Sequence, residues 1–329
     1  MDNEDVQQVD RGPSTVEDDG PRTPRGMWRL LQTPGVGAAR AMALAGSHVS
    51  WATMHRAAPD RLVKHVGRKV AEQIAEHGIP EAELTSHLDG DVLTPWTLGY
   101  PIRLRDIDGC PPLIWVRGIL PSSGRALTIV GARKPWAYGA AVAARAARTC
   151  AANDIVTVSG LADGIDTTVA EETLAEGGIH LAVIGSGVDR PRRPDLADRI
   201  LAAGGAIISE QPPGTAASPG SLVARNRIQT ALGDATLVAA AATGSGTAHT
   251  ARFALLQQRP LWVPAPTRAH ADHPAAGLLL ALADPDGIAN PEQVLHVGGR
   301  HGALLANRRP AADRVLADGD ALDDAIISL

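Results

Sequence analysis

The hydrophobic residues of this chain follow two patterns, one before residue 90 and another after residue 125. Over residues 26–85, apolar and polar positions recur at the spacing of amphipathic helices. Glycine and proline interrupt this pattern at Pro34–Gly37, at Gly46 and at Gly67. The pattern predicts a small bundle of short helices, of helix-hairpin-helix or SAM-like type.

From residue 127 onward, short runs of consecutive apolar residues alternate with helical stretches. The predicted strands are Leu127–Val130, Ile155–Ser159, Leu181–Gly185, Ala206–Ser209, Thr236–Ala240 and Leu261–Val263. The predicted helices between them span residues 138–151, 165–176, 194–203, 221–232 and 247–258. Strands without alternation are buried on both faces, and strand–helix repeats build parallel sheets. The sequence therefore predicts an α/β fold, a Rossmann-like doubly wound parallel sheet preceded by the helical domain.

Weaker patterns flank these two regions. Residues 89–124 are rich in Pro and Gly, and we expect a connector with one strand, Leu113–Val116. Beyond residue 264 the spacing predicts helices at Pro291–Leu295 and at Ala311–Leu316. The predicted organisation is therefore an acidic tail (1–25), a small helical domain (26–88), a connector (89–124), a Rossmann-like domain (125–296) and a short C-terminal tail (297–329).

The net charge of −5 is unevenly distributed, since residues 1–20 carry seven acidic residues against Arg11. Such a segment is expected to be a disordered tail, and it lacks the basic and apolar regions of a signal peptide. No run of about 18 apolar residues predicts a membrane span. Two cysteines, Cys110 and Cys150, are too few for a disulfide framework. We therefore expect a cytoplasmic protein without membrane contact.

The loops after the predicted strands carry the candidate chemistry. In a parallel α/β sheet, ligands bind beyond the C-terminal ends of the strands. Here these loops are rich in glycine, small hydroxyl residues and charge: Gly131-Ala132-Arg133-Lys134, Ser159-Gly160 with Gly164, Gly185-Ser186-Gly187, Glu210-Gln211-Pro212 and Gly244-Ser245-Gly246-Thr247. Backbone amides and arginines in such loops attract anions.

Several familiar sites are not indicated. The loops contain neither a dinucleotide fingerprint, a Walker motif nor a nucleophile elbow. His270 and His273 lack the spaced partners of a metal site, so we expect solvated loop residues there. The sequence thus predicts no cofactor, no metal and no catalytic residue.

The segment Ser221–Ile228 contains two arginines, Arg225 and Arg227, on either side of Asn226. Two positions apart on a helix, their side chains diverge by about 200°, so both cannot face one ligand. One interpretation is that one arginine holds a phosphate while the other pairs with an acid such as Glu210 or Asp166. The other is that both are ordinary surface residues.

The turn Pro34-Gly35-Val36-Gly37 resembles that of a helix-hairpin-helix. In that motif a glycine turn presents backbone amides to a nucleic-acid phosphate. A tight turn between two helices, without a ligand, fits the same residues.

The order of motifs from Leu127 to Pro264 resembles the DprA/Smf family of DNA-processing recombination mediators. The motifs are Ile129-Val130-Gly131-Ala132-Arg133 with Tyr138-Gly139, Val158–Asp166, Gly185-x-Gly187-x-Asp189, Ser209–Thr215, Arg225-Asn226-Arg227-Ile228 and Ser245-Gly246-Thr247-x-x-Thr250-Ala251. With the helical region, the resemblance covers about residues 26–296.

The resemblance implies a homodimeric, cytosolic, non-enzymatic protein that binds single-stranded DNA and helps load the RecA recombinase, as in natural transformation. The implied DNA-binding residues are Gly131, Ala132, Arg133, Gly139, Ser159, Gly160, Gly164, Gly185, Gly187, Arg225, Asn226, Arg227, Ser245, Gly246 and Thr247; Lys134 is added for its position. Asp166 and Glu210 are expected to shape the loops or orient an arginine.

This chain departs from the family pattern at several positions. Ala132 replaces a serine, which removes a hydroxyl donor and leaves the backbone N–H. Leu222-Val223 replaces Phe-Pro, so weaker DNA binding is expected unless Trp136 or Tyr138 supplies the base stacking instead. Arg190, Arg192 and Arg193 add positive charge near the pocket, and the C-terminal tail is too short for a complete winged helix.

Two other functions fit part of the sequence. Phosphoribohydrolases of the same superfamily cleave nucleoside monophosphates with a glutamate in the loop that corresponds to Gly244–Thr250, where this chain has none. The second function is therefore that of a nucleotide-binding or phosphoribohydrolase-like member of the same superfamily. The third is an interaction scaffold that has lost DNA binding, which the acidic N-terminal segment would fit.

Overall fold

The computed structural model describes residues 20–47, 50–56, 59–81, 91–121, 124–265, 272–286, 288, 290–306 and 311–329. The tail expected over residues 1–25 therefore lies mostly outside the described residues, as does His270. The chain forms two compact units, Met1–Glu83 and Leu84–Leu329.

The described part of the first unit is helical. Its helices are α1 (Pro24–Gln32), α2 (Ala38–Ser47), α3 (Trp51–Arg56), α4 (Pro59–Val66) and α5 (Arg68–His77). Met27, Leu30, Leu44 and Leu62 are buried between them, because each helix turns one apolar stripe inward. The predicted helical domain is confirmed, and α2 ends at Ser47, one residue after Gly46, where an interruption was expected.

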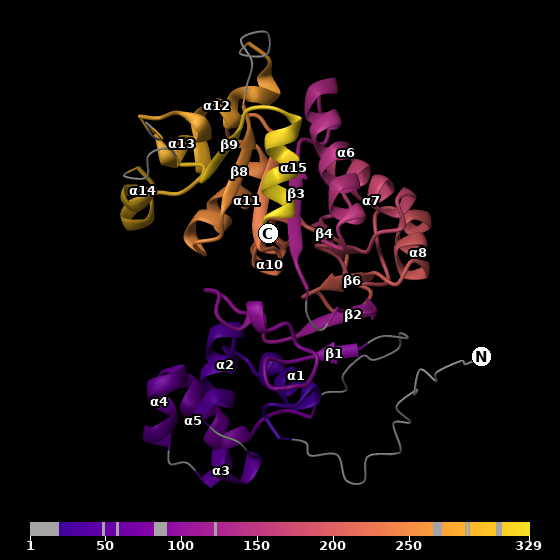
Figure 1. The fold of residues 1–329 in the computed structure, drawn as a ribbon. Coiled ribbons are helices and arrows are strands. Elements are labelled where there is room, and N and C mark those ends of the chain that lie inside the picture. Colours follow the sequence, from indigo (N-terminus) through magenta and orange to yellow (C-terminus); the bar gives the residue numbers. More distant parts are fainter. Residues whose placement is uncertain are drawn as a thin grey trace, which may run out of the picture. The chain divides into compact units, whose positions relative to one another are not determined.

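The second unit is built on a nine-stranded sheet in the order β1-β2-β6-β5-β4-β3-β7-β8-β9 (Figure 1). The strands are β1 (Asp91–Leu93), β2 (Ile114–Gly118), β3 (Ala126–Gly131), β4 (Val156–Ser159), β5 (His180–Val183), β6 (Ala206–Ser209), β7 (Ala235–Ala240), β8 (Leu261–Pro264) and β9 (Arg314–Leu316). Strands β3 to β9 run parallel to one another, whereas β2 pairs antiparallel with both β6 and β1.

Helices cover both faces of this sheet. On one face lie α6 (Ala137–Ala152), α7 (Ile165–Ala175), α8 (Pro194–Ala202) and α15 (Gly319–Ile327). On the other lie α10 (Asn226–Leu232), α11 (Gly246–Leu256), α12 (Gly277–Ala283) and the short helix η1 (Ile102–Leu104). Helices α9 (Pro219–Ala224), α13 (Pro291–Leu295) and α14 (Gly299–Ala306) and the short helix η3 (Pro274–Ala276) complete the described elements.

The apolar strands fill separate cores on the two faces. Leu127 and Ile129 of β3 pack under α6, α7 and α15, whereas Val130 points to the opposite face with Val238. This alternation along one strand buries both faces. The predicted Rossmann-like α/β fold, with its six central strands, is confirmed.

Three details of the prediction are wrong. Residues 311–316 form a bend followed by the strand β9, not a helix. The helix predicted over residues 221–232 is two short helices that meet at Arg225. The connector holds a second strand, β1, in addition to the predicted one. Among the described residues, no helix combines the length and the apolar character that a membrane crossing requires.

Candidate nucleic-acid interface

The candidate site lies where the order of the sheet reverses. The chain proceeds outward from β3 through β4, β5 and β6, and then returns to place β7 on the other side of β3. Beyond the C-terminal ends of β3 and β7 the surface is hollowed into a cavity of about 780 Å³. Such a reversal point is the usual ligand site of an open α/β sheet.

The main cavity is lined by the loops after β3, β4 and β7, by residues of α7, α9, α10 and α11, and by the short helix η3. Its wall contains Val130, Gly131, Ala132, Arg133, Lys134, Ala162, Asp166, Pro219, Leu222, Val223, Arg225, Asn226, Gln229, Ala242, Ser245, Gly246, Thr247, Thr250, His273, Pro274 and Ala275. A side hollow of about 350 Å³ adjoins it. The two share Arg133, Ala162, Leu222 and Arg225.

The loop after β3 is fixed by the strands and the helix beside it. The amide of Ala132 donates to the carbonyl of Ala240, 2.7 Å away, and the carbonyl of Ala132 accepts from the amide of Ile165. The Ala132 N–H, expected to remain available to a ligand, is therefore already used. A Cβ at Gly131 would lie 2.5 Å from Ile165, so only glycine fits between β3 and α7.

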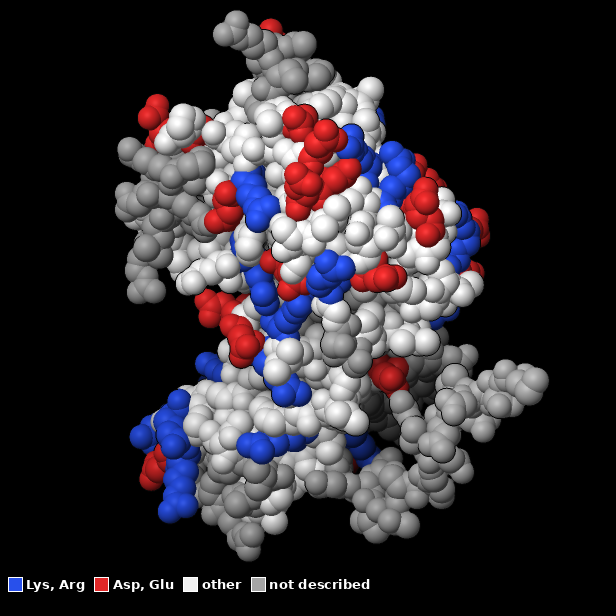
Figure 2. All heavy atoms as spheres, viewed as in Figure 1, with Lys and Arg blue, Asp and Glu red and all other residues white. Residues whose placement is uncertain are grey.

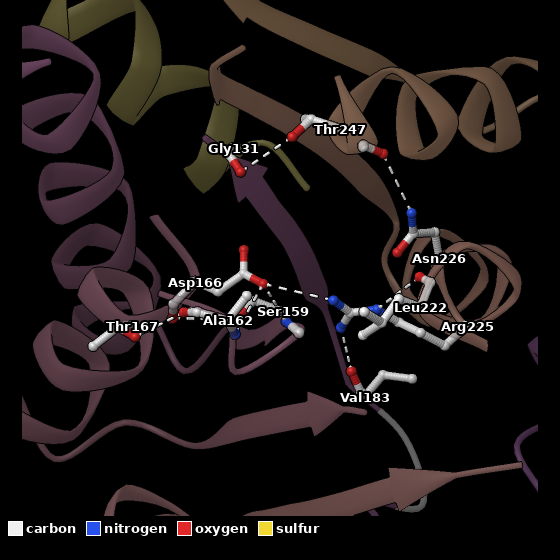
Figure 3. Close-up of polar contacts among 12 residues, drawn as sticks. Gly131, Ser159, Ala162, Asp166, Thr167, Val183, Leu222, Arg225, Asn226 and Thr247 are labelled. Atoms are coloured by element: carbon white, nitrogen blue, oxygen red, sulfur yellow. Dashed lines mark hydrogen bonds and ion pairs between the residues drawn. The ribbon is translucent and has the colours of Figure 1, made fainter. Parts of the chain in front are cut away.

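A buried ion pair crosses from α7 to the junction between α9 and α10 (Figure 3). Asp166 accepts hydrogen bonds from the amides of Gly160, at 3.1 Å, and Ala162, at 3.4 Å. Arg225 lies 3.9 Å from the same carboxylate and donates to the carbonyl of Val183. Both side chains are buried, so each charge depends on the other and on these backbone groups.

The electrostatics of this pair follow from its burial. Loss of hydration raises the pKa of the Asp166 carboxyl, while Arg225 and the two amides oppose this rise. Burial also lowers the pKa of Arg225, but a guanidinium remains charged at neutral pH. The pair therefore holds the β4 loop and the α9–α10 junction together.

Two glycines of the β4 loop make these close contacts possible. A Cβ at Gly160 would overlap the guanidinium of Arg225. Gly164 has a positive φ of 81° and packs against the backbone of Ala132 and Arg133, where a side chain would collide. Both residues thus shape the loop.

The other predicted glycines and the serine of these loops are packed in the interior. Gly139 lies against Ala240 and Gly187 against Pro212 and Pro213, whereas Gly185 faces Leu222 at the side hollow. Ser159 is fully buried; its hydroxyl lies 3.3 Å from the carbonyl of Asp166 and 3.4 Å from Nε2 of His180.

Arg227 points away from the cavity. Its guanidinium forms a bidentate ion pair with Glu210, with N–O distances of 2.8 and 2.5 Å. Nε donates to the carbonyl of Gly109 in the connector. Arg227 and Glu210 line neither hollow, and together they fasten the connector to the sheet. The two arginines thus diverge as predicted, but each has an acidic partner.

Helix α11 begins at the cavity. Ser245, its N-cap, makes no side-chain capping bond, and its buried hydroxyl has no partner among the described residues. The hydroxyl of Thr247 donates to the carbonyl of Gly131, 3.1 Å away (Figure 3). Gly246 and Thr247, in the first turn of this helix, line the cavity beside the end of β3, and a helix N-terminus at a cavity is an arrangement that binds anions.

Asn226 and Gln229 of α10 contribute carboxamides to the same wall. Asn226 donates weakly to the carbonyl of Gly246, at 3.5 Å. Gln229 is 1% exposed, and its Nε2 has no hydrogen-bond partner among the described residues. The sequence motif indicated Asn226, whereas Gln229 was not predicted, since the motif ends one residue earlier.

The two aromatic residues that could replace the missing stacking group are not part of the cavity wall. Trp136 and Tyr138 line neither hollow. Trp136 packs edge-on against His273, with ring centroids 4.5 Å apart. As expected, His273 is an exposed loop residue. It also lines the main cavity, and its ring accepts a hydrogen bond from the amide of Ala275.

Four cations line the rim of the two hollows, with one acid close by. Arg133 and Lys134 are exposed and form no hydrogen bond or ion pair with another described residue. Arg190 and Arg192 line the side hollow, where Arg192 pairs with Asp163 at 2.5 Å. Arg193 also contacts Asp163, at 3.4 Å, but lines neither hollow. Arg133 and Lys134 are thus the cations most available to a ligand.

Comparison with known proteins identifies the family of this fold and site. The family model described as DNA recombination-mediator protein A matches residues 91–290. Protein Smf of Synechocystis is 36% identical over 170 residues, which are 49% of this chain and 42% of that protein. A putative DNA processing protein DprA of Mycobacterium tuberculosis is 31% identical over 212 residues, 59% of this chain and 54% of that protein.

The solved structures agree on the fold. The X-ray structure of DNA processing protein A from Streptococcus pneumoniae aligns with a TM-score of 0.64 at 22% identity, over 77% of this chain and 89% of that one. This chain spans about half the length of the curated relatives that it matches. The family model covers more than half of the chain, and the chain therefore belongs to the DNA recombination-mediator protein A family.

Proposed function

We propose that this protein binds single-stranded DNA at the cavity beyond β3 and β7. Arg133 and Lys134 supply available positive charge at the rim, and the first turn of α11 adds backbone amides. Guanidinium, ammonium and amide groups are the ones that hold phosphates without reading sequence. The observation that carries the proposal is this pairing of unengaged cations with a helix N-terminus in one cavity.

The contacts within the site divide the motif residues into two roles. Arg225 and Asp166 hold the loops in place, since each already satisfies the other. Arg227 and Glu210 act at the connector, outside the cavity. Direct contact with phosphate is therefore assigned to Arg133, Lys134 and Gly246.

The biological role extends this binding. Members of the family carry the names DNA processing protein and recombination-mediator protein. We propose that this chain likewise coats single-stranded DNA as a homodimer and presents it to a RecA recombinase, without catalysing a reaction. The homodimer, the presentation of DNA to RecA, the absence of catalysis and a role in natural transformation are supported by family membership alone.

Replacing Arg133 and Lys134 by alanine tests the site. We expect the R133A/K134A variant to bind a labelled ~30-nucleotide single strand at least ~10-fold more weakly, measured by fluorescence anisotropy. The dependence of log Kd on log salt should flatten by about 0.7 for each phosphate that the variant no longer neutralises. The matched control is R105A/R199A, which removes two exposed arginines that line neither hollow.

An R133A/K134A variant that binds as tightly as the R105A/R199A control would show that the cavity does not bind DNA.

The alternative function, that of a nucleotide-cleaving enzyme, needs an available carboxylate. Apart from Asp166, no acid lines either hollow among the described residues, and Asp166 is engaged with Arg225. Assay of the intact protein for release of a base from nucleoside monophosphates distinguishes this alternative directly.

A further inference from the structure

The helical unit has a strongly basic character of its own. Residues 20–81 contain nine basic and four acidic residues, a net charge of +5 in a chain whose total is −5. Several of these cations are used internally: Arg29 pairs with Glu81 at 2.8 Å, and Arg22 donates to the carbonyls of Ala45 and Gly46. Among the others, the exposed residues are Arg25, Arg40, Arg61, Lys64, Arg68 and Lys69.

Four of these cations lie on α4 and α5, the two helices that flank the turn at Gly67. Arg61 and Lys64 lie one turn apart on α4, and Arg68 and Lys69 open α5; all four are exposed. Figure 2 shows lysine and arginine side chains gathered over α4. Arg61, Lys64 and Lys69 pair with no acid among the described residues.

Few acids offset this charge. Glu72 lies 3.9 Å from Arg68, with both side chains more than half exposed. An exposed pair at that distance contributes little. Asp60 at the start of α4 and Glu76 on α5 are the other acids of the two helices. The surface at the turn is therefore predominantly positive.

The backbone at this turn is open to a ligand. Gly67 has a φ of 80°, and a Cβ placed on it would meet no atom within 4 Å. Helix α5 has no side-chain cap, and the amides of Arg68, Lys69 and Val70 donate to no described residue. A phosphate approaching this turn would meet both the amides and the basic side chains.

The glycine turn between α1 and α2 lies against the same end of α5. A Cβ on Gly35 would come within 2.7 Å of the Val70 side chain, so the two turns are in contact. Arg40, at the start of α2, donates to the carbonyl of Gly35 at 2.6 Å and remains exposed. Arg40 thereby joins Arg61, Lys64, Arg68 and Lys69 in one surface, called here the turn patch.

We propose that the turn patch binds the phosphodiester backbone of DNA, so that the chain has a second DNA-binding surface besides the cavity of the sheet. The choice of DNA as the partner rests on the proposed function. A protein partner is disfavoured, because the exposed large apolar side chains of the described residues all lie beyond residue 97. Protein interfaces are usually centred on apolar and aromatic groups.

The K64A/K69A variant of the full chain tests this proposal. We expect ~10-fold weaker binding of a 30-nucleotide single strand at ~50 mM salt, with a salt slope smaller by up to about 1.4. The loss should be equal for oligothymidine and for a mixed sequence, since a backbone contact reads no bases. The R105A/R199A variant removes the same charge from the second unit and should bind within ~2-fold of the parent protein.

The two sites are separated by comparing variants. If K64A/K69A binds DNA as tightly as R105A/R199A, the turn patch is not a DNA-binding surface, whatever the affinity of R133A/K134A. Loss of binding in K64A/K69A with none in R133A/K134A overturns the cavity instead and leaves the patch in place. A loss that depends on base composition overturns backbone recognition. Thermal melting verifies the fold of each variant, and K64Q/K69Q replaces K64A/K69A should that variant unfold.

Discussion

At the scale of single residues, the two arginines of the Arg-Asn-Arg motif illustrate what the sequence predicts and what it does not. The spacing correctly predicted that Arg225 and Arg227 diverge. It could not reveal that Arg225 would meet Asp166 while Arg227 would meet Glu210, because these acids follow different strands. Only the order of the strands in the sheet decides which acid faces which arginine.

The members of the cavity wall show the same limit. Arg133 and Lys134 follow a predicted strand end, so their position at the rim could be anticipated. Gln229 and His273 could not, since one lies in the second turn of a helix and the other beyond an unpatterned loop. Their place depends on how α10 and η3 pack on the sheet.

His180 should make the stability of the sheet depend on pH. Its ring is fully buried in β5 beside Thr157 and Ser159, and burial lowers its pKa from 6.5 to about 3. Below pH 6.5, His180 is therefore protonated in the unfolded chain, whereas in the folded chain it stays neutral down to about pH 3. The contribution of neutral His180 to the free energy of unfolding is fully present above pH 6.5 and decreases as the pH falls towards 3.

Urea unfolding at pH 7.0 and pH 5.5 measures this contribution. Between these values the parent protein should lose about 1 kcal/mol more than His180→Gln, in which the titrating group is absent. His77→Gln, at an exposed position on α5, should keep the pH dependence of the parent. An identical pH dependence in His180→Gln and the parent would show that His180 is not the responsible group.

At the scale of elements, the central strands were predictable and the last strand was not. Strands β3 to β8 are mostly apolar, with only isolated buried polar residues, and nearly all of their side chains are buried on both faces. Residues 311–316 carry apolar residues at 311, 312, 315 and 316, which matches helical spacing. The free edge of β8 overrides this local preference, because pairing satisfies the backbone groups of both strands.

The final helix shows that the residues after 297 take part in the core. Ile326 of α15 is fully buried against the β3 face, whereas its neighbour Ile327 is 51% exposed. We expect Ile326→Ala to lower the free energy of unfolding by about 2–4 kcal/mol, because a cavity remains where the side chain was. Ile327→Ala should cost less than about 0.5 kcal/mol.

Denaturant unfolding of the two neighbouring variants supplies the comparison. Equal effects at the two positions would mean that α15 does not pack on the sheet in solution. Because the substitutions differ only in burial, helix propensity and expression affect both alike.

At the scale of the whole molecule, the total net charge does not predict whether this protein attracts DNA. The +5 of residues 20–81 and the −6 of residues 1–20 leave −4 for residues 82–329. A chain that is acidic overall cannot be attracted to a polyanion by its total charge. Attraction must come from local clusters, namely the cavity rim and the turn patch.

Deleting residues 2–19 should tighten DNA binding at low salt. The deletion removes seven acidic residues and one arginine, so repulsion of the phosphate backbone falls. We expect a gain of several-fold at ~20 mM salt that disappears near ~300 mM, where charges are screened within a few ångströms. Anisotropy titrations at both salt concentrations measure it, and a gain that persists at high salt would contradict an electrostatic origin.

The hydrogen bond between Thr247 and Gly131 joins positions 116 residues apart in the chain. A cavity assembled from such distant segments exists only once β3, β7 and the loops between them have come together. The unfolded chain offers no comparable cavity, so any ligand held there draws the population towards the folded form. Occupancy of the cavity therefore protects the whole second unit against unfolding and proteolysis, not merely the loops that touch the ligand.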